Sequence, residues 1–181
     1  MTTAREGLLD AFEDLLIDGG ERSTTLDAVA ARAQVSKGGL LYHFPSKNAL
    51  VDGLVERLQE RTDQDSATMR DAPEGAAAYY VTSSAEVDSP FDRTFLAVFR
   101  LAMSAEESAT RAIQRIRGQW LELIREDLHD DDLAMAVLLM GDGLYYNASL
   151  ASAGLSEAPE TEASLLRALE RLRQRGEAPA E

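Results

Sequence analysis

The chain has 181 residues, of which 45% are hydrophobic and 28% are charged, a composition typical of a globular protein with its own core. It contains no cysteine, which excludes disulfides, thiolate nucleophiles and cysteine-based zinc sites. The formal net charge of −14 argues against uniform attraction to nucleic acid, because phosphate repels an acidic surface.

The first predicted element is a helix over residues 4–18. Its apolar residues recur at helical spacing and form one broad stripe: Leu8, Leu9, Ala11, Phe12, Leu15 and Leu16. Acidic residues fall within this periodicity, so the N-terminus lacks the basic and then apolar layout of a signal peptide. We therefore expect a cytoplasmic protein. Gly19 and Gly20 are expected to end the helix.

Two short helices are predicted next, over residues 26–33 and 37–44, with a tight turn between them. The first has an apolar face at helical spacing, so it is expected to pack against a larger element. A threonine, Thr24 or Thr25, is expected to cap its first turn, and Ser36 is placed to cap the second helix.

The second of these helices begins with two glycines, which are unusual in a helix that serves stability alone. Gly38 and Gly39 each cost about 1 kcal/mol of helix stability relative to alanine. Without side chains, they let the backbone come close to a partner surface. Lys37, Tyr42 and His43 place hydrogen-bond donors around this bare patch. A phosphate-lined groove fits the description.

The charge of this segment differs from that of the rest of the chain. Between Arg22 and Lys47 there are four cations and only one acid, Asp27, so the window carries +3 while the whole chain carries −14. The only two lysines of the sequence, Lys37 and Lys47, both lie in this window. An acidic body would orient the approach of the basic segment to DNA.

This stretch resembles the DNA-binding segment of the tetracycline-repressor (TetR) family of bacterial transcription regulators. The matching features occur in the family's order: Thr24-Thr25, Ala28 to Ala33, Val35-Ser36, Tyr42-His43-Phe44 and Lys47. Two residues depart from the family's pattern. Gln34 stands where glycine is usual in the turn, and Leu41 replaces the commoner aromatic residue of the recognition helix.

The resemblance implies a two-part organisation and a function. Residues 1–46 are expected to form a three-helix, helix-turn-helix DNA-binding domain, and residues 47–181 a helical domain for ligand binding and dimerisation. The protein would then be a ligand-responsive transcription regulator, most often a repressor in such families, that binds double-stranded DNA through a recognition helix over residues 37–43.

Two-fold symmetry predicts the form of the DNA target and the roles of the contacting residues. A homodimer presents two recognition helices, so we expect an inverted-repeat operator. Groups at helix ends are assigned to phosphates: Thr25, Tyr42, His43 and Lys47. The outward face of the recognition helix is assigned to base edges in the major groove: Lys37, Gly38, Gly39 and Leu41.

The remainder of the chain is predicted to be helical throughout. Pro45 ends the recognition helix and Ser46 can cap a linking helix over residues 47–61, after which the polar stretch 61–71 indicates a boundary or a bend. Further helices are expected at about 74–87, 91–103, 106–128, 131–153 and 160–175. No segment alternates like a strand, so the predicted fold class is all-α.

Aromatic and methionine side chains gather on the predicted helices of the second domain. Each is, taken alone, more often a core residue. Together they are typical of a small-molecule cavity, the place where the resembled family binds its effector. The residues assigned to this site are Tyr79, Phe95, Phe99, Met103, Trp120 and Met135. The alternative is a regulator without a true ligand pocket.

Residues 133–155 are apolar and long enough to suggest a membrane span. Asp142 near the centre would cost about 2.5 to 3.5 kcal/mol on insertion, so we expect no membrane association. A helix buried on two sides is the better interpretation. Together with the leucine seam of residues 160–175, formed by Leu165, Leu169 and Leu172, it predicts a four-helix homodimer interface.

An enzyme is not expected, because no phosphate loop, nucleophile elbow or paired histidine spacing occurs. His129 lies in the acidic run from Glu122 to Asp132, which is interpreted as a solvated surface rather than a metal site. No cofactor and no metal are therefore predicted. A helical interaction module without DNA-binding activity stays open as an alternative, and a salt-dependent shift of duplex DNA would separate the two.

Overall fold

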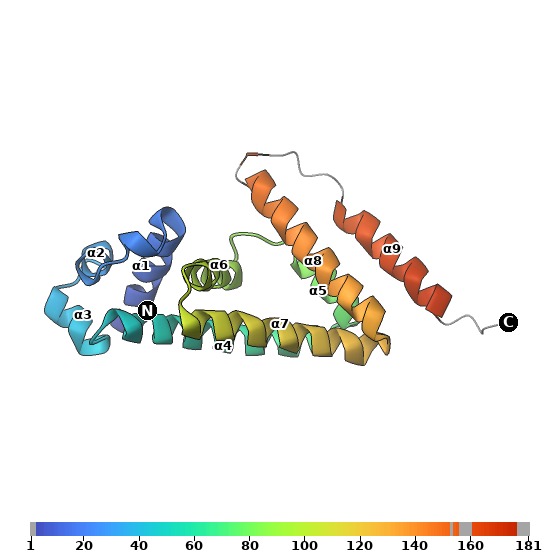
Figure 1. Cartoon of the computed structure of the whole chain (residues 1–181), viewed down its shortest axis with the longest axis horizontal. Helices are drawn as coiled ribbons and strands as arrows, with labels where there is room; N and C mark the ends of the chain where they lie inside the picture. The colour runs from blue at the N-terminus through green and yellow to red at the C-terminus, as the bar shows by residue number, and fades with distance from the viewer. Residues whose placement is uncertain (1–2, 153, 156–160, 177–181) are drawn as a thin grey trace. The chain divides into compact units, whose positions relative to one another are not determined.

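The computed structural model describes residues 3–152, 154–155 and 161–176, and all regular structure in these residues is helical (Figure 1). The predicted all-α class is confirmed. The described α-helices are α1 (Ala4–Gly19), α2 (Leu26–Arg32), α3 (Lys37–His43), α4 (Lys47–Arg70), α5 (Ala76–Ser83), α6 (Pro90–Met103), α7 (Glu107–Leu128), α8 (Asp131–Ser152) and α9 (Thr161–Gly176). A 3-10 turn, η1 (Glu21–Ser23), follows α1.

The predicted end of the linking helix near residue 61 is wrong, because α4 continues to Arg70. Thr62, Ser66 and Met69 lie on one side of this extension and are buried, so its buried side combines two small polar residues with a single apolar one. The Thr62 hydroxyl donates to the Leu58 carbonyl at 2.8 Å, which satisfies it inside the helix. Apolar periodicity in the sequence therefore does not reveal the buried side of this part of α4.

Other predicted helix ends differ less. α5 is shorter than the predicted 74–87, since it begins after Gly75, whose φ is 90°, and ends at Ser83. The predicted ends at residues 153 and 160, and the polar tail after residue 176, lie outside the described residues.

The chain divides into two compact units. The first contains the residues up to Thr62 together with Pro90–Ile116, and the second contains Asp63–Ser89 and the residues from Arg117 onward. α4 and α7 each contribute to both units. The predicted functional division between residues 46 and 47 is a different division, and it stays a prediction.

In the first unit, α1 is the central element. It packs against α2 and α6, and its predicted apolar stripe is largely buried (Figure 1). Leu40 of α3 and Leu54 of α4 are fully buried in the same core. Gly20, with a φ of 70°, ends α1 where the two glycines predicted a stop. The three-helix arrangement of α1, α2 and α3 is thereby fixed against the start of α4.

A buried charge cluster also joins α1 to α4 and α6 within this unit. The side chain of Arg57 is 5% exposed and donates to Glu13 at 3.0 Å, to Asp10 at 2.7 Å and to Glu6 at 2.5 Å. The buried Glu13 also accepts a hydrogen bond from the Thr94 hydroxyl of α6 at 2.7 Å. The buried guanidinium therefore has several carboxylate partners, as a charge removed from water requires.

In the second unit, α5, α8 and α9 pack against one another, and α8 and α9 run side by side (Figure 1). Arg117 of α7 forms two hydrogen bonds to the carboxylate of Asp142 on α8, at 2.6 and 2.7 Å. Asp127 accepts a hydrogen bond from the backbone N–H of Ala77, in the first turn of α5, at 2.9 Å. Among the described helices, none is both long and apolar enough to cross a membrane.

Candidate nucleic-acid interface

Hydrogen bonds at the starts of α2 and α3 set the geometry of the helix pair. The hydroxyl of Thr25 accepts from the N–H of Ala28 at 3.1 Å, so Thr25 is the cap of α2. The predicted cap of α3 is confirmed, because the Ser36 hydroxyl accepts from the N–H of Gly39 at 3.0 Å. Both caps orient the first turns of the two helices and leave these residues exposed.

The turn between α2 and α3 forms with glutamine where glycine is usual. Gln34 adopts a φ of 57°, the left-handed conformation that favours glycine and costs other residues about 1 to 2 kcal/mol. The N–H of Val35 nevertheless donates to the Ala30 carbonyl at 3.0 Å, so the turn closes. Gln34 departs from the family's residue but not from the conformation required there.

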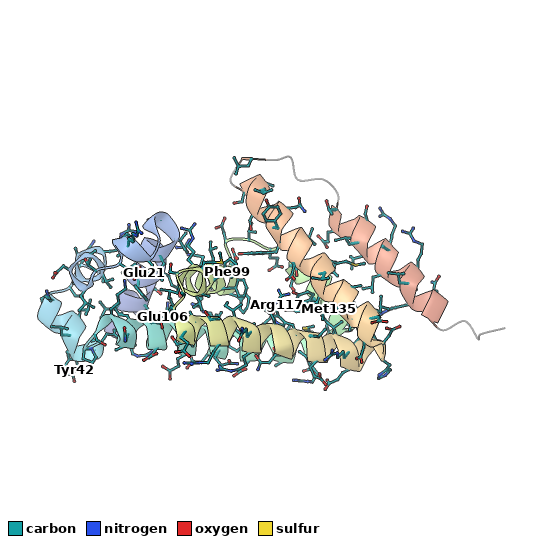
Figure 2. All side chains as sticks on the ribbon, in the orientation of Figure 1. Glu21, Tyr42, Phe99, Glu106, Arg117 and Met135 are labelled. Atoms are coloured by element: carbon teal, nitrogen blue, oxygen red, sulfur yellow. The ribbon has the colours of Figure 1, made fainter. Side chains whose placement is uncertain are left out.

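α3 has one side fixed in the core and the other free. Leu40 is fully buried and Phe44, directly after the helix, is buried against Gly53, where an added Cβ would lie 2.8 Å from the Phe44 ring. The outward side carries the residues assigned to DNA: Lys37, Gly38, Gly39, Leu41, Tyr42 and His43, all exposed. Tyr42 is 85% exposed and projects from α3 into solvent (Figure 2).

Packing within the chain does not explain Gly38. A Cβ added there would have one neighbour, the Ser36 hydroxyl oxygen, at the ordinary contact distance of 3.9 Å. At Gly39 the same oxygen would lie at 3.3 Å, which is tighter. The surface at Gly38 is thus bare although the protein itself has room for a side chain. This is the pattern expected where an external surface approaches the backbone.

Both lysines of the chain have carboxylate partners. Lys37 lies 3.0 Å from Asp27, and both side chains are largely exposed. The Lys47 ammonium, at the start of α4, donates to the Glu21 carbonyl at 3.1 Å and also to the Glu21 carboxylate. The +3 charge of residues 22–47 is therefore partly neutralised from outside this window, since Glu21 pairs with Lys47, whereas Asp27 is already counted in the +3.

The remaining residues assigned to phosphates lie at the ends of α2 and α3. Thr25 is exposed, and its hydroxyl proton stays available because the oxygen is the acceptor of the cap bond. The rings of Tyr42 and His43 meet edge to face, with centroids 5.1 Å apart. Sequence reasoning missed Glu21 altogether, since it is 26 residues from Lys47 and no short-range pattern links the two.

The six residues assigned to a ligand fall into two groups, one in each unit. Phe95, Phe99 and Met103 follow one another along α6 in the first unit, where Phe95 stacks on Phe99 with centroids 6.2 Å apart. Phe99 and Met103 are exposed. Figure 2 labels Phe99 on α6 and Met135 on α8.

Tyr79, Trp120 and Met135 belong to the second unit. The Tyr79 hydroxyl donates to the carboxylate of Asp65 at 2.9 Å, and burial raises the pKa of both groups. Trp120 is buried and its ring centroid lies 5.5 Å from that of Tyr80. Met135 is exposed on α8. Trp120 and Tyr79 thus belong to one polar and aromatic neighbourhood, whereas Met135 faces solvent.

A pocket of about 440 Å³ opens elsewhere in the second unit, where α7 passes into α8 beside α9. It is lined by Asp127, Leu128, His129, Asp130, Leu133, Leu172 and Arg173. None of the six predicted ligand residues lines it. The sequence had been interpreted there as a solvated acidic surface, and Asp127 in fact pairs with Arg173 of α9 at 2.5 Å.

Models of protein families match both parts of the chain. Residues 8–54 match "Bacterial regulatory proteins, tetR family", and residues 74–174 match "Tetracyclin repressor-like, C-terminal domain". The chain is also 26% identical over 178 residues to the HTH-type transcriptional regulator BetI of Burkholderia mallei strain NCTC 10229, an alignment that covers 89% of this chain and 87% of the relative.

Solved structures share the fold. A TetR-like transcriptional regulator from Rhodococcus sp. RHA1 has a TM-score of 0.64 at 21% identity, with 97% of this chain and 96% of that chain covered. The multidrug binding protein EbrR, solved with malachite green, has a TM-score of 0.68 at 18% identity, with 93% and 96% covered. Salmonella enterica GusR has a TM-score of 0.65 at 19% identity, with 94% and 95% covered.

Proposed function

The chain belongs to the TetR family of DNA-binding transcriptional regulators and is not an enzyme, and from this premise we propose that it is a ligand-responsive repressor. It binds an inverted-repeat operator as a homodimer, with α3 of each protomer in the major groove. Residues 1–46 form the DNA-binding domain, and residues 47–181 serve ligand binding and dimerisation.

The bare outward side of α3 is the observation that supports DNA binding here. Gly38 exposes backbone that internal packing does not require to be bare, and donors of Lys37 and Tyr42 flank it. The ammonium of Lys37, at the start of α3, can donate hydrogen bonds to guanine O6 and N7. The exposed side chain of Leu41 can only contact apolar groups such as a thymine methyl. Tyr42, His43, Thr25 and Lys47 position the helix on phosphates.

The two lysines test this division of roles. Lys47→Ala should weaken binding to operator and random DNA alike and reduce the salt slope by up to about 0.9 per half-site, because it removes a phosphate contact. Lys37→Ala should cost about 1 to 3 kcal/mol chiefly on the operator, because it removes a base contact. The measurement is a series of binding titrations at several salt concentrations on both DNAs, with the operator selected from random duplexes.

A matched control is Arg111→Ala, which removes one exposed cation that pairs with Glu107 on α7. It should leave both affinities near those of the parent protein. Equal loss of specificity in the Lys37 and Lys47 variants would contradict the assigned roles. Failure of the parent protein to shift any duplex at low salt would contradict DNA binding and favour a helical interaction module instead.

An apolar or amphipathic small molecule is proposed as the effector. EbrR, which has a similar fold, is a multidrug binding protein solved with malachite green. In the second unit, Tyr79 and Trp120 have aromatic rings with polar tips, which suit such a ligand, and Met135 belongs to the same group. In the first unit, Phe99 and Met103 expose apolar surface and, with Phe95, form a separate candidate contact.

The lone tryptophan provides the readout for the effector. Binding near Trp120 should change its emission and raise the melting temperature, since a ligand that binds only the folded state stabilises it. A broad panel of lipophilic compounds that changes neither quantity would favour the alternative, a regulator without an effector pocket. Release of operator DNA by a hit would identify the response as induction.

A further inference from the structure

We propose that Glu21 competes with DNA phosphate for Lys47 and thereby sets how strongly the protein holds DNA. This inference rests on the proposed contact between Lys47 and a phosphate. It adds a residue that determines affinity and salt dependence without touching the DNA bases. Glu21 is labelled in Figure 2.

The position of Glu21 follows from the end of α1. Gly20 adopts a φ of 70° and turns the chain into η1, whose first residue is Glu21. The Glu21 carbonyl is held by Thr24, which donates to it from its hydroxyl at 2.6 Å and from its backbone N–H at 3.3 Å. Since Thr24 is itself buried, this carbonyl is a fixed point in the fold.

Lys47 reaches Glu21 from the first turn of α4. Its ammonium donates to the Glu21 carbonyl at 3.1 Å and to the Glu21 carboxylate. An ammonium has three donors, and this arrangement occupies two of them with oxygen atoms of a single residue. The side chains of Lys47 and Glu21 are 34% and 37% exposed, so the pair is reachable from solvent but partly shielded from it.

A phosphate that binds Lys47 therefore competes with the Glu21 carboxylate or is repelled by it. Either it replaces the carboxylate as acceptor, or it binds beside a negative charge that repels it. Both routes lower the free energy gained from the phosphate contact. Glu21 has a second effect, because it offsets the unfavourable position of a cation at the positive end of the α4 dipole. The Glu21 carboxylate thus stabilises the charged Lys47 in the DNA-free protein and thereby weakens the binding of DNA.

The second lysine pair supports this choice of residue by contrast. Lys37 and Asp27 are 56% and 73% exposed, and pairs that are so accessible to water contribute little. Among the residues that the structure describes, the partner of the Lys37 ammonium is the Asp27 carboxylate, with no backbone carbonyl in addition. Competition should consequently be measurable at Glu21 and weak at Asp27.

The test is Glu21→Gln, which keeps the shape and the backbone carbonyl but removes the charge. We expect binding to operator and random DNA to tighten by up to about fivefold per half-site, the range of an exposed ion pair. The salt slope should become steeper by the part of the full contribution of about 0.9 per half-site that Lys47 does not already make in the parent protein, because Lys47 then makes a full phosphate contact. Titrations at several salt concentrations measure both quantities.

Two controls separate competition from a general change of charge. Glu107→Gln also removes one negative charge from an exposed pair, 2.8 Å from Arg111 on α7, and should tighten binding much less. In a Lys47→Ala background, Glu21→Gln should change nothing, since the competing cation is gone.

Three results would overturn the inference. Unchanged affinity of Glu21→Gln would show that no competition exists, and weaker binding would show that Glu21 instead positions Lys47 toward DNA. Tightening that persists in the Lys47→Ala background would show a long-range charge effect. If the parent protein binds no duplex at all, the proposed function fails and this inference fails with it. Parent binding with an unresponsive Glu21 variant overturns the inference alone.

Discussion

Asp65 is a carboxyl group in the second unit whose surroundings favour the uncharged form. Removal from water raises its pKa, although Tyr79 donates a hydrogen bond to it at 2.9 Å. The folded protein therefore binds a proton at Asp65 more readily than the unfolded chain does. Ionised Asp65 lowers the stability at pH values above its folded pKa, and this loss is recovered as the pH falls toward the pKa of the unfolded chain.

We expect Asp65→Asn to be more stable than the parent protein at about pH 8, with an advantage that shrinks as the pH is lowered to about 4. The amide oxygen of asparagine can still accept from the Tyr79 hydroxyl. Urea unfolding at a series of pH values measures the difference. Asp63→Asn, an exposed position on the same helix, is the matched control. A difference that does not vary with pH would contradict the assigned cause.

At this scale, the sequence predicted local hydrogen bonds and missed the long-range ones. Ser36 and Ser46 cap α3 and α4 as expected, because a cap depends on residues three positions away. The pairing of Lys47 with Glu21 depends on how η1 is turned by Gly20, which only the folded chain determines. A count of charges along the sequence treats each charged side chain as independent, whereas Lys47 is paired with Glu21 in the folded chain.

Gly141 on α8 shows how two helices of the second unit fit together. A Cβ added there would lie 2.3 Å from the ring of Tyr80 on α5 and 2.7 Å from the hydroxyl oxygen of Ser84, the residue directly after α5. These close neighbours belong to the same protomer, so the absence of a side chain at Gly141 makes room for Tyr80.

We expect Gly141→Ala to lower the free energy of unfolding by about 1 to 3 kcal/mol, because the side chain overfills a packed contact. Gly118→Ala on α7 is the control, since a Cβ there would meet nothing within 4 Å. It should raise the stability by about 0.5 to 1 kcal/mol through helix propensity. Chemical denaturation of both variants compares them directly. Equal effects in the two would mean that the α5–α8 contact is not as tight as described.

The elements themselves were largely predictable, with one informative failure. Helices with an apolar stripe, such as α1, were found because burial and periodicity coincide. The second half of α4 was not predicted to be helical, because the polar residues Thr62 and Ser66 lie on its buried side and break the apolar periodicity. The predicted ligand residues show a similar failure. Their helix faces were assigned from residue spacing, and spacing does not tell that Met135 is exposed while Trp120 is buried.

Dimerisation concerns the whole molecule, and the apolar surface of α8 makes it testable. Leu139 is 57% exposed, and Met135 and Tyr146 on the same helix are exposed as well. Leu169 of the predicted α9 seam is only 2% exposed within the protomer, so an acidic substitution there would report on folding rather than association. Leu139 is the better probe.

We expect the parent protein to sediment as a dimer at micromolar concentration and Leu139→Asp to shift it to monomer, because a charge cannot be buried unpaired in an interface. Operator affinity should fall with it, since two linked recognition helices bind far more tightly than one. Met103→Asp, which changes an apolar side chain on α6 that is 73% exposed, should leave the dimer intact. A dimer that survives Leu139→Asp would contradict the proposed interface.

The charge cluster around Arg57 also constrains the order in which substitutions can accumulate in this lineage. Loss of Arg57 alone would leave Glu13, whose side chain is only 6% exposed, with the more distant guanidinium of Arg61 at 3.8 Å and the Thr94 hydroxyl as its partners. Asp10 and Glu6 are 56% and 42% exposed, so water can replace their partner. Substitutions at the exposed Asp10 and Glu6 should therefore be tolerated more easily than substitutions at the buried Arg57 and Glu13. Exchange of Arg57 and Glu13 for apolar residues should therefore cost less stability when both change together than when either changes alone.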